Sequence, residues 1–182
     1  AGRAWAFGER PGSSQSVFAL GRFAAKESDP GYDALRVADM ILGGSFAARL
    51  TADLREDKGW TYGIYSSLDE TLAVGGFFVR SQVRGEVTRP ALDAVLAHLA
   101  RLRKAPPAAA ELEQAKNLLA GRFVRELETQ EGLADAILRD ALFGLPDDRL
   151  DGFIARVRSV GAKQVQEAAA RWLGGGPFYE PH

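Results

Sequence analysis

The sequence predicts an α+β fold, in which an antiparallel-rich mixed β-sheet has helices packed on one face. Segments with strand composition gather in the first half of the 182-residue chain, whereas the second half consists of segments with helical periodicity. Turn-type clusters or short loops separate the strands that follow one another. Because strands and helices are segregated, a doubly wound parallel sheet is excluded. No internal repeat or linker divides the chain, so we expect a single domain over residues 1–182.

Composition excludes several classes of protein. The formal net charge is −1 and the chain has no cysteine, which argues against a nucleic-acid partner and excludes disulfides and thiolate metal sites. No apolar run approaches the ~18 residues of a membrane-spanning helix, so no transmembrane segment is expected. The compartment stays open, with bacterial periplasm and cytoplasm both compatible. The one methionine is Met40, which is compatible with excision from a longer polypeptide or with removal of a methionine before Ala1. Because the chain opens in strand-like sequence, we expect excision from a longer polypeptide.

Two strands are predicted near the N-terminus, over residues 3–8 and 15–24, because both are rich in Val, Phe and Trp and a turn-type cluster, ERPGSS, lies between them. A helix is predicted over residues 32–42. Its apolar face is formed by Leu35, Ala38 and Leu42.

A second helix is predicted over residues 46–58, with Ser45 as its N-cap and Gly59 as its end. Its buried stripe repeats every four residues and consists of Phe46, Leu50 and Leu54. Residues 60–68 and 73–83 then read as an antiparallel hairpin. Further helices are predicted over 88–104, 107–128, 131–143, 147–158 and 162–173.

Metal and nucleophilic chemistry find little support in the chain. A zinc site needs three or four closely placed ligands, but the histidines are His98 and His182 alone, and neither H-E-x-x-H nor H-x-x-E-H occurs. We therefore expect no metal in this chain. His98 lies at the edge of an apolar helical stripe and is interpreted as a partly buried structural histidine. The glycines of LGGSF, residues 42–46, are interpreted as a tight turn between helices and not as a phosphate site.

The stretch LREDKGWTYGIY, residues 54–65, contains the strongest candidate site. Arg55 falls in the last turn of a predicted helix, where a cation opposes the helix dipole. Strand alternation places Tyr62 on the same face as Trp60 and Ile64, so a half-buried tyrosine with a satisfied hydroxyl is expected. Local spacing favours this structural interpretation. If the turn brings the helix end and the strand start together, however, a permanent cation and a phenol donor face one cleft. Such donors suit a peptide carbonyl or an oxyanion and assist an attack launched by a group that this chain lacks.

The surrounding segment, LGGSFAARLTADLREDKGWTYGIYSSL, resembles the hallmark segment of the non-catalytic half of pitrilysin/insulinase-type zinc peptidases. This family includes the mitochondrial processing peptidases and paired bacterial subunits. The matching positions are Leu42, Gly43, Gly44, Ser45, Phe46, Arg49, Leu50, Leu54, Arg55, Gly59 and Tyr62. GSSQSVFALG upstream and ELEQAKNLLAGRFVRELETQEGLADAILRDALFG downstream are also similar to the family pattern. The departures are Ala48, Trp60 and Gly161, and none touches Arg55 or Tyr62.

The resemblance implies a division of labour between two homologous halves that close around a peptide. One half carries zinc through an inverted H-x-x-E-H motif. The other half, which this chain resembles, lacks zinc and contacts substrate near the scissile bond through an Arg and a Tyr, at positions Arg55 and Tyr62. The resemblance therefore implies a zinc-bearing partner half, in the same polypeptide or in a separate subunit, and a peptide substrate. It also implies that the sheet face away from the helices lines the cleavage chamber.

Three other classes of function stay open at this level. The chain could be a structural homologue without proteolytic role, as in the core subunits of respiratory complexes, or a stand-alone peptide-binding module. A self-contained metalloenzyme is the third class, and the small number of metal ligands argues against it.

Overall fold

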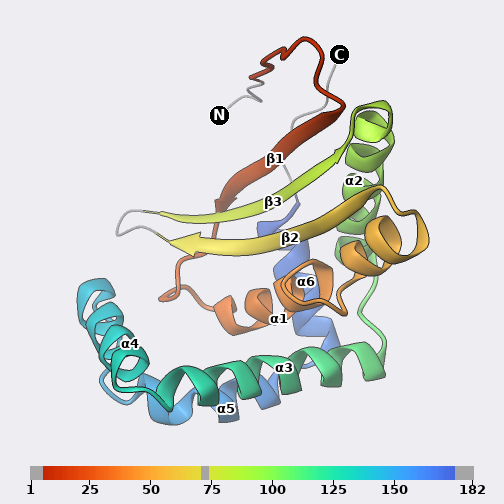
Figure 1. Cartoon of the computed structure of the whole chain (residues 1–182). Coiled ribbons are helices and arrows are strands. Elements are labelled where there is room, and N and C mark those ends of the chain that lie inside the picture. The colour runs from red at the N-terminus through yellow and green to blue at the C-terminus, as the bar shows by residue number, and fades with distance from the viewer. Residues whose placement is uncertain (1–5, 71–73, 175–182) are drawn as a thin grey trace.

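The computed structural model describes residues 6–70 and 74–174, and shows one layer of three strands with helices packed against it (Figure 1). The strands are β1 (Gln15–Ala24), β2 (Thr61–Glu70) and β3 (Gly75–Arg84). The α-helices are α1 (Tyr32–Leu42), α2 (Thr88–Lys104), α3 (Ala109–Leu127), α4 (Gln130–Phe143), α5 (Arg149–Ser159) and α6 (Ala162–Trp172). Two short helices of other types are η1 (Thr51–Asp57) and η2 (Gly85–Val87). The predicted α+β class is confirmed.

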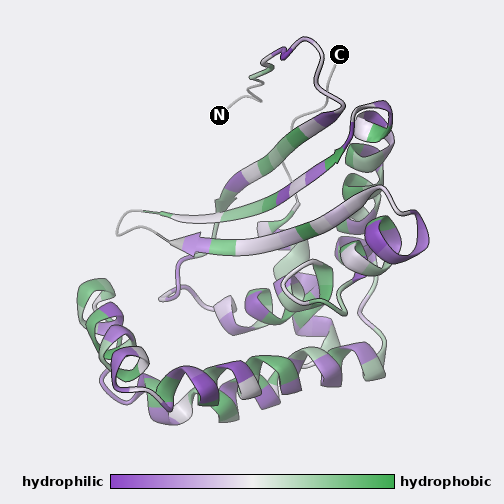
Figure 2. Ribbon diagram, viewed as in Figure 1, coloured by the Kyte–Doolittle hydropathy of each residue, from purple (hydrophilic) through white to green (hydrophobic). Residues whose placement is uncertain are grey.

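The sheet has the strand order β1-β3-β2, and both pairings are antiparallel. The predicted hairpin is therefore present, and β1 pairs with β3 along its whole length, from Gln15 opposite Arg84 to Ala24 opposite Gly75. Hydrophobic and hydrophilic residues alternate along β1 and around α3 (Figure 2), as expected for elements with one buried face.

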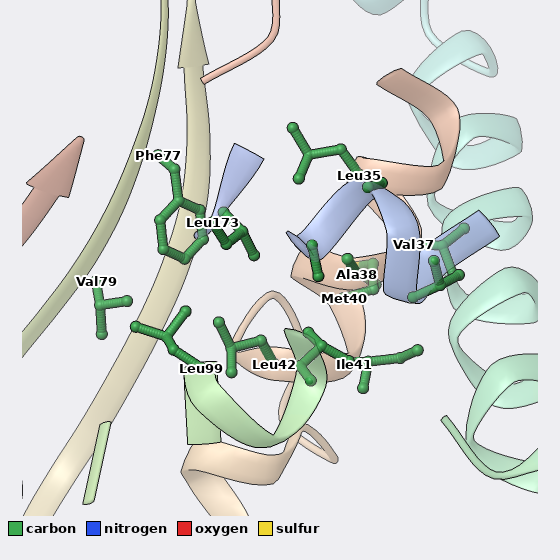
Figure 3. Close-up of a cluster of buried hydrophobic side chains, with 14 of the residues drawn as sticks. Leu35, Val37, Ala38, Met40, Ile41, Leu42, Phe77, Val79, Leu99 and Leu173 are labelled. Atoms are coloured by element: carbon green, nitrogen blue, oxygen red, sulfur yellow. The ribbon is translucent and has the colours of Figure 1, made fainter. Parts of the chain in front are cut away.

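The buried face of the sheet packs on α1, which lies at the centre of the molecule. Phe77 and Val79 of β3 lie beside residues of α1 and α2 and beside Leu173, which directly follows α6 (Figure 3). The face predicted for α1 is confirmed, because Leu35, Ala38 and Leu42 are fully buried. The other fully buried large side chains include Leu50, Leu54, Ile64, Leu99, Leu102, Phe153 and Leu173.

The predicted strand over residues 3–8 is not found in the part of it that can be judged. Residues 6–8 are irregular, and residues 3–5 lie outside the described range. Phe7 is exposed. Strand composition needs a ladder partner and a surface to pack on, and among the described residues no strand pairs with this segment.

The prediction of one regular helix over residues 46–58 is wrong in its first turn and in its type. Residues 45–48 form turns, and the helix from Thr51 has π-type bonding, with the N–H of Lys58 bonded to the carbonyl of Asp53. Ser45 is not an N-cap, since its hydroxyl donates to the carbonyl of Met40 at 3.3 Å. Phe46 is 66% exposed because it precedes the helix and is not aligned with the buried stripe.

Within the described ranges, no helix is long and apolar enough to cross a membrane.

Candidate functional site

Tyr62 lies at the start of β2, where a β-bulge interrupts the pairing with β3. Thr61 is opposite Val83 and Ile64 is opposite Ser81, so Tyr62 and Gly63 together face the single residue Gln82. The extra residue resets the alternation of side chains. Thr61 and Ile64 both point into the core, and Tyr62 points to solvent with 91% of its surface exposed. The half-buried Tyr62 expected from strict alternation is therefore wrong.

Arg55 lies in the last turn of η1, on the other side of the connection to β2. Its guanidinium stacks on Phe46, with 4.6 Å between Cζ and the ring centroid, and its Nε is 3.5 Å from the carboxylate of Glu56. The side chain is 36% exposed. Phe46 contacts the flat face of the guanidinium and accepts no directed hydrogen bond, and Glu56 lies near Nε. The guanidinium therefore keeps N–H groups that can donate to a further acceptor.

The connection between the two residues is short and defined. Gly59 has φ of +60°, the left-handed conformation that ends a helix, as predicted. Its N–H bonds to the carbonyl of Arg55 at 3.2 Å, and the N–H of Trp60 bonds to that of Leu54 at 2.9 Å. Helix η1 packs against β2, so the helix that carries Arg55 lies beside the strand that carries Tyr62. No hydrogen bond joins Arg55 to Tyr62 in the described part of the chain.

A polar network fixes η1 to α2. Asp53 accepts hydrogen bonds from Lys58 at 2.7 Å and from Nε2 of His98 at 2.8 Å, and Arg101 is 3.0 Å from Nδ1 of the same ring. Burial lowers the pKa of His98, and the charge of Arg101 adds to this effect although the bond to Asp53 opposes it. Burial alone would raise the pKa of Asp53, but the bonds from Lys58 and His98 outweigh it and the pKa is lowered. His98 is thus a buried structural histidine, as interpreted from sequence.

A second contact fixes the residues that precede η1. Arg49 makes a bidentate ion pair with Glu111 of α3, with both N–O distances at 2.6 Å. The helix that carries Arg55 is therefore attached to α2 and to α3 by charged side chains.

The sheet face opposite the helices presents aromatic rings that the sequence analysis did not single out. Phe78 lies flat across Gly21 and Gly76, since a Cβ on either glycine would come within 2.8 Å of its ring, and Tyr65 lies over Gly63 in the same way. Arg80 stacks on Phe78 at 4.5 Å. Their alternate positions in β2 and β3 were a usable signal, but alternation alone does not say which face is covered.

Asp39 of α1 is a second feature missed by the sequence analysis. Its carboxylate accepts a 2.5 Å hydrogen bond from Ser66 of β2 and lines a cleft of about 360 Å³ between α1, α3 and β2. Burial raises the pKa of Asp39 to about 6, against the bond from Ser66. The three arginines of this cleft are paired, Arg36 and Arg139 with Glu27 and Arg122 with Glu126. Nothing there marks a particular ligand.

The described residues do not suit a resident metal ion. No group of three or more His, Asp or Glu side chains in that part of the chain could hold one. His98 is occupied by Asp53 and Arg101, and His182 lies outside the described range.

The fold is that of a non-catalytic half of a zinc metallopeptidase. The model of the peptidase M16 inactive domain matches residues 7–119, so the chain belongs to this family. The resemblance to the non-catalytic half of pitrilysin/insulinase-type zinc peptidases is thereby confirmed.

Individual relatives agree with the family assignment. The chain is 27% identical over 138 residues to the uncharacterized zinc protease YmxG of Bacillus subtilis, a match that covers 76% of this chain and 34% of the relative. It is similar to the peptidase M16 inactive domain from Pseudomonas fluorescens, with a TM-score of 0.81, 28% identity, and coverage of 93% of this chain and 43% of the other. The chain thus spans less than half the length of these relatives.

A third relative has a similar size. The inactive peptidase domain of a provisionally named zinc protease from Bordetella parapertussis has a TM-score of 0.75 and 25% identity, with coverage of 90% of this chain and 88% of the other. A chain of the Candida albicans Complex III2 shares the fold alone, at 13% identity and a TM-score of 0.72.

Proposed function

We propose that the chain is the substrate-binding half of a zinc-dependent metalloendopeptidase, and that it grips peptide substrate and walls the cleavage chamber. The observation that carries the proposal is the placement of Tyr62 and Arg55. The phenol is exposed on the face that the helices leave open, and the guanidinium lies at the end of the helix that leads into the same strand.

The catalytic metal belongs to a homologous partner half in this proposal. That half is part of the same polypeptide or a separate subunit, and its zinc supplies the activated water. The division fits the match to an inactive domain of zinc proteases and the lack of a suitable donor set among the described residues.

The role of this chain is to supply hydrogen-bond donors. Arg55 offers a fixed positive charge with several N–H groups, and Tyr62 offers one O–H; both bind the substrate backbone near the bond that is cleaved. Removing one preorganised donor to a developing oxyanion typically costs ~10²–10³ in rate. Neither residue fills the core, so their role is separable from stability.

The test uses this chain reconstituted with its zinc-bearing half and a fluorogenic peptide. Tyr62→Phe and Arg55→Ala are expected to lower kcat/KM by ~10²–10³ while circular dichroism stays unchanged. Arg55→Ala should lower the free energy of unfolding by no more than the ~0.5–1 kcal/mol of its contact with Phe46. Tyr65→Phe and Arg84→Ala are matched controls, because both side chains are exposed on the same sheet. Wild-type rates in both site variants would refute the proposal and leave a purely structural role.

A further inference from the structure

Two buried hydroxyl groups lie beneath the bulge that carries Tyr62. Thr61 is 8% and Ser81 is 7% exposed, and both face the core side of the sheet among apolar neighbours such as Ile64, Val79 and Val83. Their oxygens are 3.1 Å apart. Burying a hydroxyl group costs free energy unless it is hydrogen-bonded, whereas valine and alanine would pack at these positions without that requirement.

All hydrogen bonds of this pair go to backbone groups of the bulge or to each other. Thr61 Oγ1 accepts from the N–H of Gly63 at 3.0 Å and donates to the carbonyl of Gln82 at 2.7 Å. Ser81 Oγ donates to the carbonyl of Gly63 at 2.9 Å. These are the groups that lose their ladder partners when an extra residue is inserted into one strand. The two hydroxyls therefore replace the missing bonds of the bulge.

The bulge decides which face of the sheet Tyr62 occupies. Further along β2, Ile64 and Ser66 point inward and fix the register. Counting back from Ile64 by strict alternation would put Tyr62 on the core side and Thr61 on the solvent side. Only the extra residue lets Tyr62 point outward while Ile64 stays buried.

We propose that Thr61 and Ser81 are positioning residues that hold Tyr62 on the open face by satisfying the backbone of the bulge. The role in catalysis rests on the proposed function of Tyr62, but the positioning itself does not. Neither hydroxyl touches the substrate. Without them the carbonyl and N–H of Gly63, a partly buried residue, lose these partners, so the bulged register loses its advantage over the regular one.

The direct test measures the accessibility of Tyr62. The double variant Thr61→Val, Ser81→Ala keeps size and strand propensity but removes both hydroxyls. Nitration of Tyr62 by tetranitromethane, mapped by mass spectrometry and referred to N-acetyltyrosine amide in the same tube, is expected to slow roughly tenfold as the ring turns inward. Ser66→Ala is the matched control, because Ser66 is a buried hydroxyl of the same strand and face that bonds to Asp39 and not to the bulge. Thr61→Ser keeps the hydroxyl and should keep the wild-type rate.

Deletion of Gly63 provides a second, independent variant. It removes the extra residue, so Thr61 and Ile64 stay inward and Tyr62 stays outward in a regular ladder. In this background the double substitution is expected to leave nitration of Tyr62 unchanged. Slow nitration there would show that the hydroxyls act by another route and would overturn the proposal, as would unchanged nitration in the folded double variant.

Cleavage by the reconstituted pair separates this proposal from the proposed function. The double variant is expected to lower kcat about as much as Tyr62→Phe, ~10²-fold, and to add nothing when combined with it. Slowed nitration with wild-type cleavage would support the positioning and refute the catalytic role of Tyr62. Normal nitration would refute the positioning whatever the cleavage rate.

Discussion

The guanidinium of Arg55 lies over the ring of Phe46, 4.6 Å from its centroid. Phe46 is 66% exposed, so the ring contributes little to the core. It instead covers one face of the guanidinium and restricts the long side chain of Arg55, which would otherwise sample many rotamers. The aromatic residue of the LGGSF turn is thus a support for the cation of the candidate site.

Replacing Phe46 tests this support. Phe46→Ala should lower the free energy of unfolding by no more than ~1 kcal/mol, because an exposed cation–π pair is worth about 0.5–1 kcal/mol. Cleavage by the reconstituted pair should fall by a larger factor than this energy accounts for, because Arg55 loses its fixed orientation. Phe46→Tyr keeps the aromatic face and is the matched control. Equal rates for Ala, Tyr and wild type would contradict a supporting role.

The sequence predicts some residues of the fold and of the candidate site correctly and others incorrectly. Apolar periodicity predicted the buried face of the central helix α1, because Leu35, Ala38 and Leu42 recur at helical spacing on one side of it. It failed at Phe46, since a π-type helix and a preceding turn do not follow the 3.6-residue period. Arg55 and Tyr62 were named from their setting in a known motif and not from local physics.

The orientation of Tyr62 could not be obtained from the pattern of β2 alone. A bulge reverses the alternation of the side chains on one side of it relative to the other. The residues that form this bulge, Thr61, Gly63 and Ser81, lie on two different strands, so no single stretch of sequence reveals it. Asp39 was missed for a related reason. Its partner Ser66 is distant in sequence, and only the packing of α1 on β2 brings the two together.

Asp39 predicts a specific dependence of stability on pH. Its pKa in the folded state, about 6, lies above the ordinary value of 3.8. The folded state therefore favours the protonated carboxyl, and the contribution is complete below about pH 4 and lost as the pH rises through 6. We expect Asp39 to lower the free energy of unfolding by ~1–3 kcal/mol between pH 4 and 7.

Urea denaturation of Asp39→Asn across this range checks the prediction. The amide cannot ionise, so the stability of the variant relative to wild type should rise with pH by that amount. Asp93→Asn is the control, because Asp93 is exposed and pairs with Arg89 at the surface of α2. A difference between Asp39→Asn and wild type that stays constant from pH 4 to 7 would be inconsistent with a raised pKa.

His98 predicts the opposite dependence. Its pKa in the folded state is lowered from 6.5, chiefly by burial, so protonation is easier in the unfolded chain. Its contribution to stability is present above pH 6.5 and is lost as the pH falls through the lower, folded value. His98→Gln should therefore lose stability at pH 8 but show less further loss on acidification than wild type. Parallel curves for the two proteins between pH 8 and 5 would rule out this linkage.

Two glycines of the sheet predict very different costs for the same substitution. A Cβ on Gly75 would lie 2.0 Å from the carbonyl oxygen of Ala25, a backbone atom that directly follows the Ala24–Gly75 pair at the end of β1. A Cβ on Gly21 would lie 2.7 Å from the ring of Phe78, which can turn into solvent on the open face. Gly75→Ala should cost several kcal/mol or prevent folding, whereas Gly21→Ala should cost ~1 kcal/mol or less. Thermal and urea unfolding of the two variants measure this contrast. Similar losses would mean that the open face is as tightly packed as the ladder.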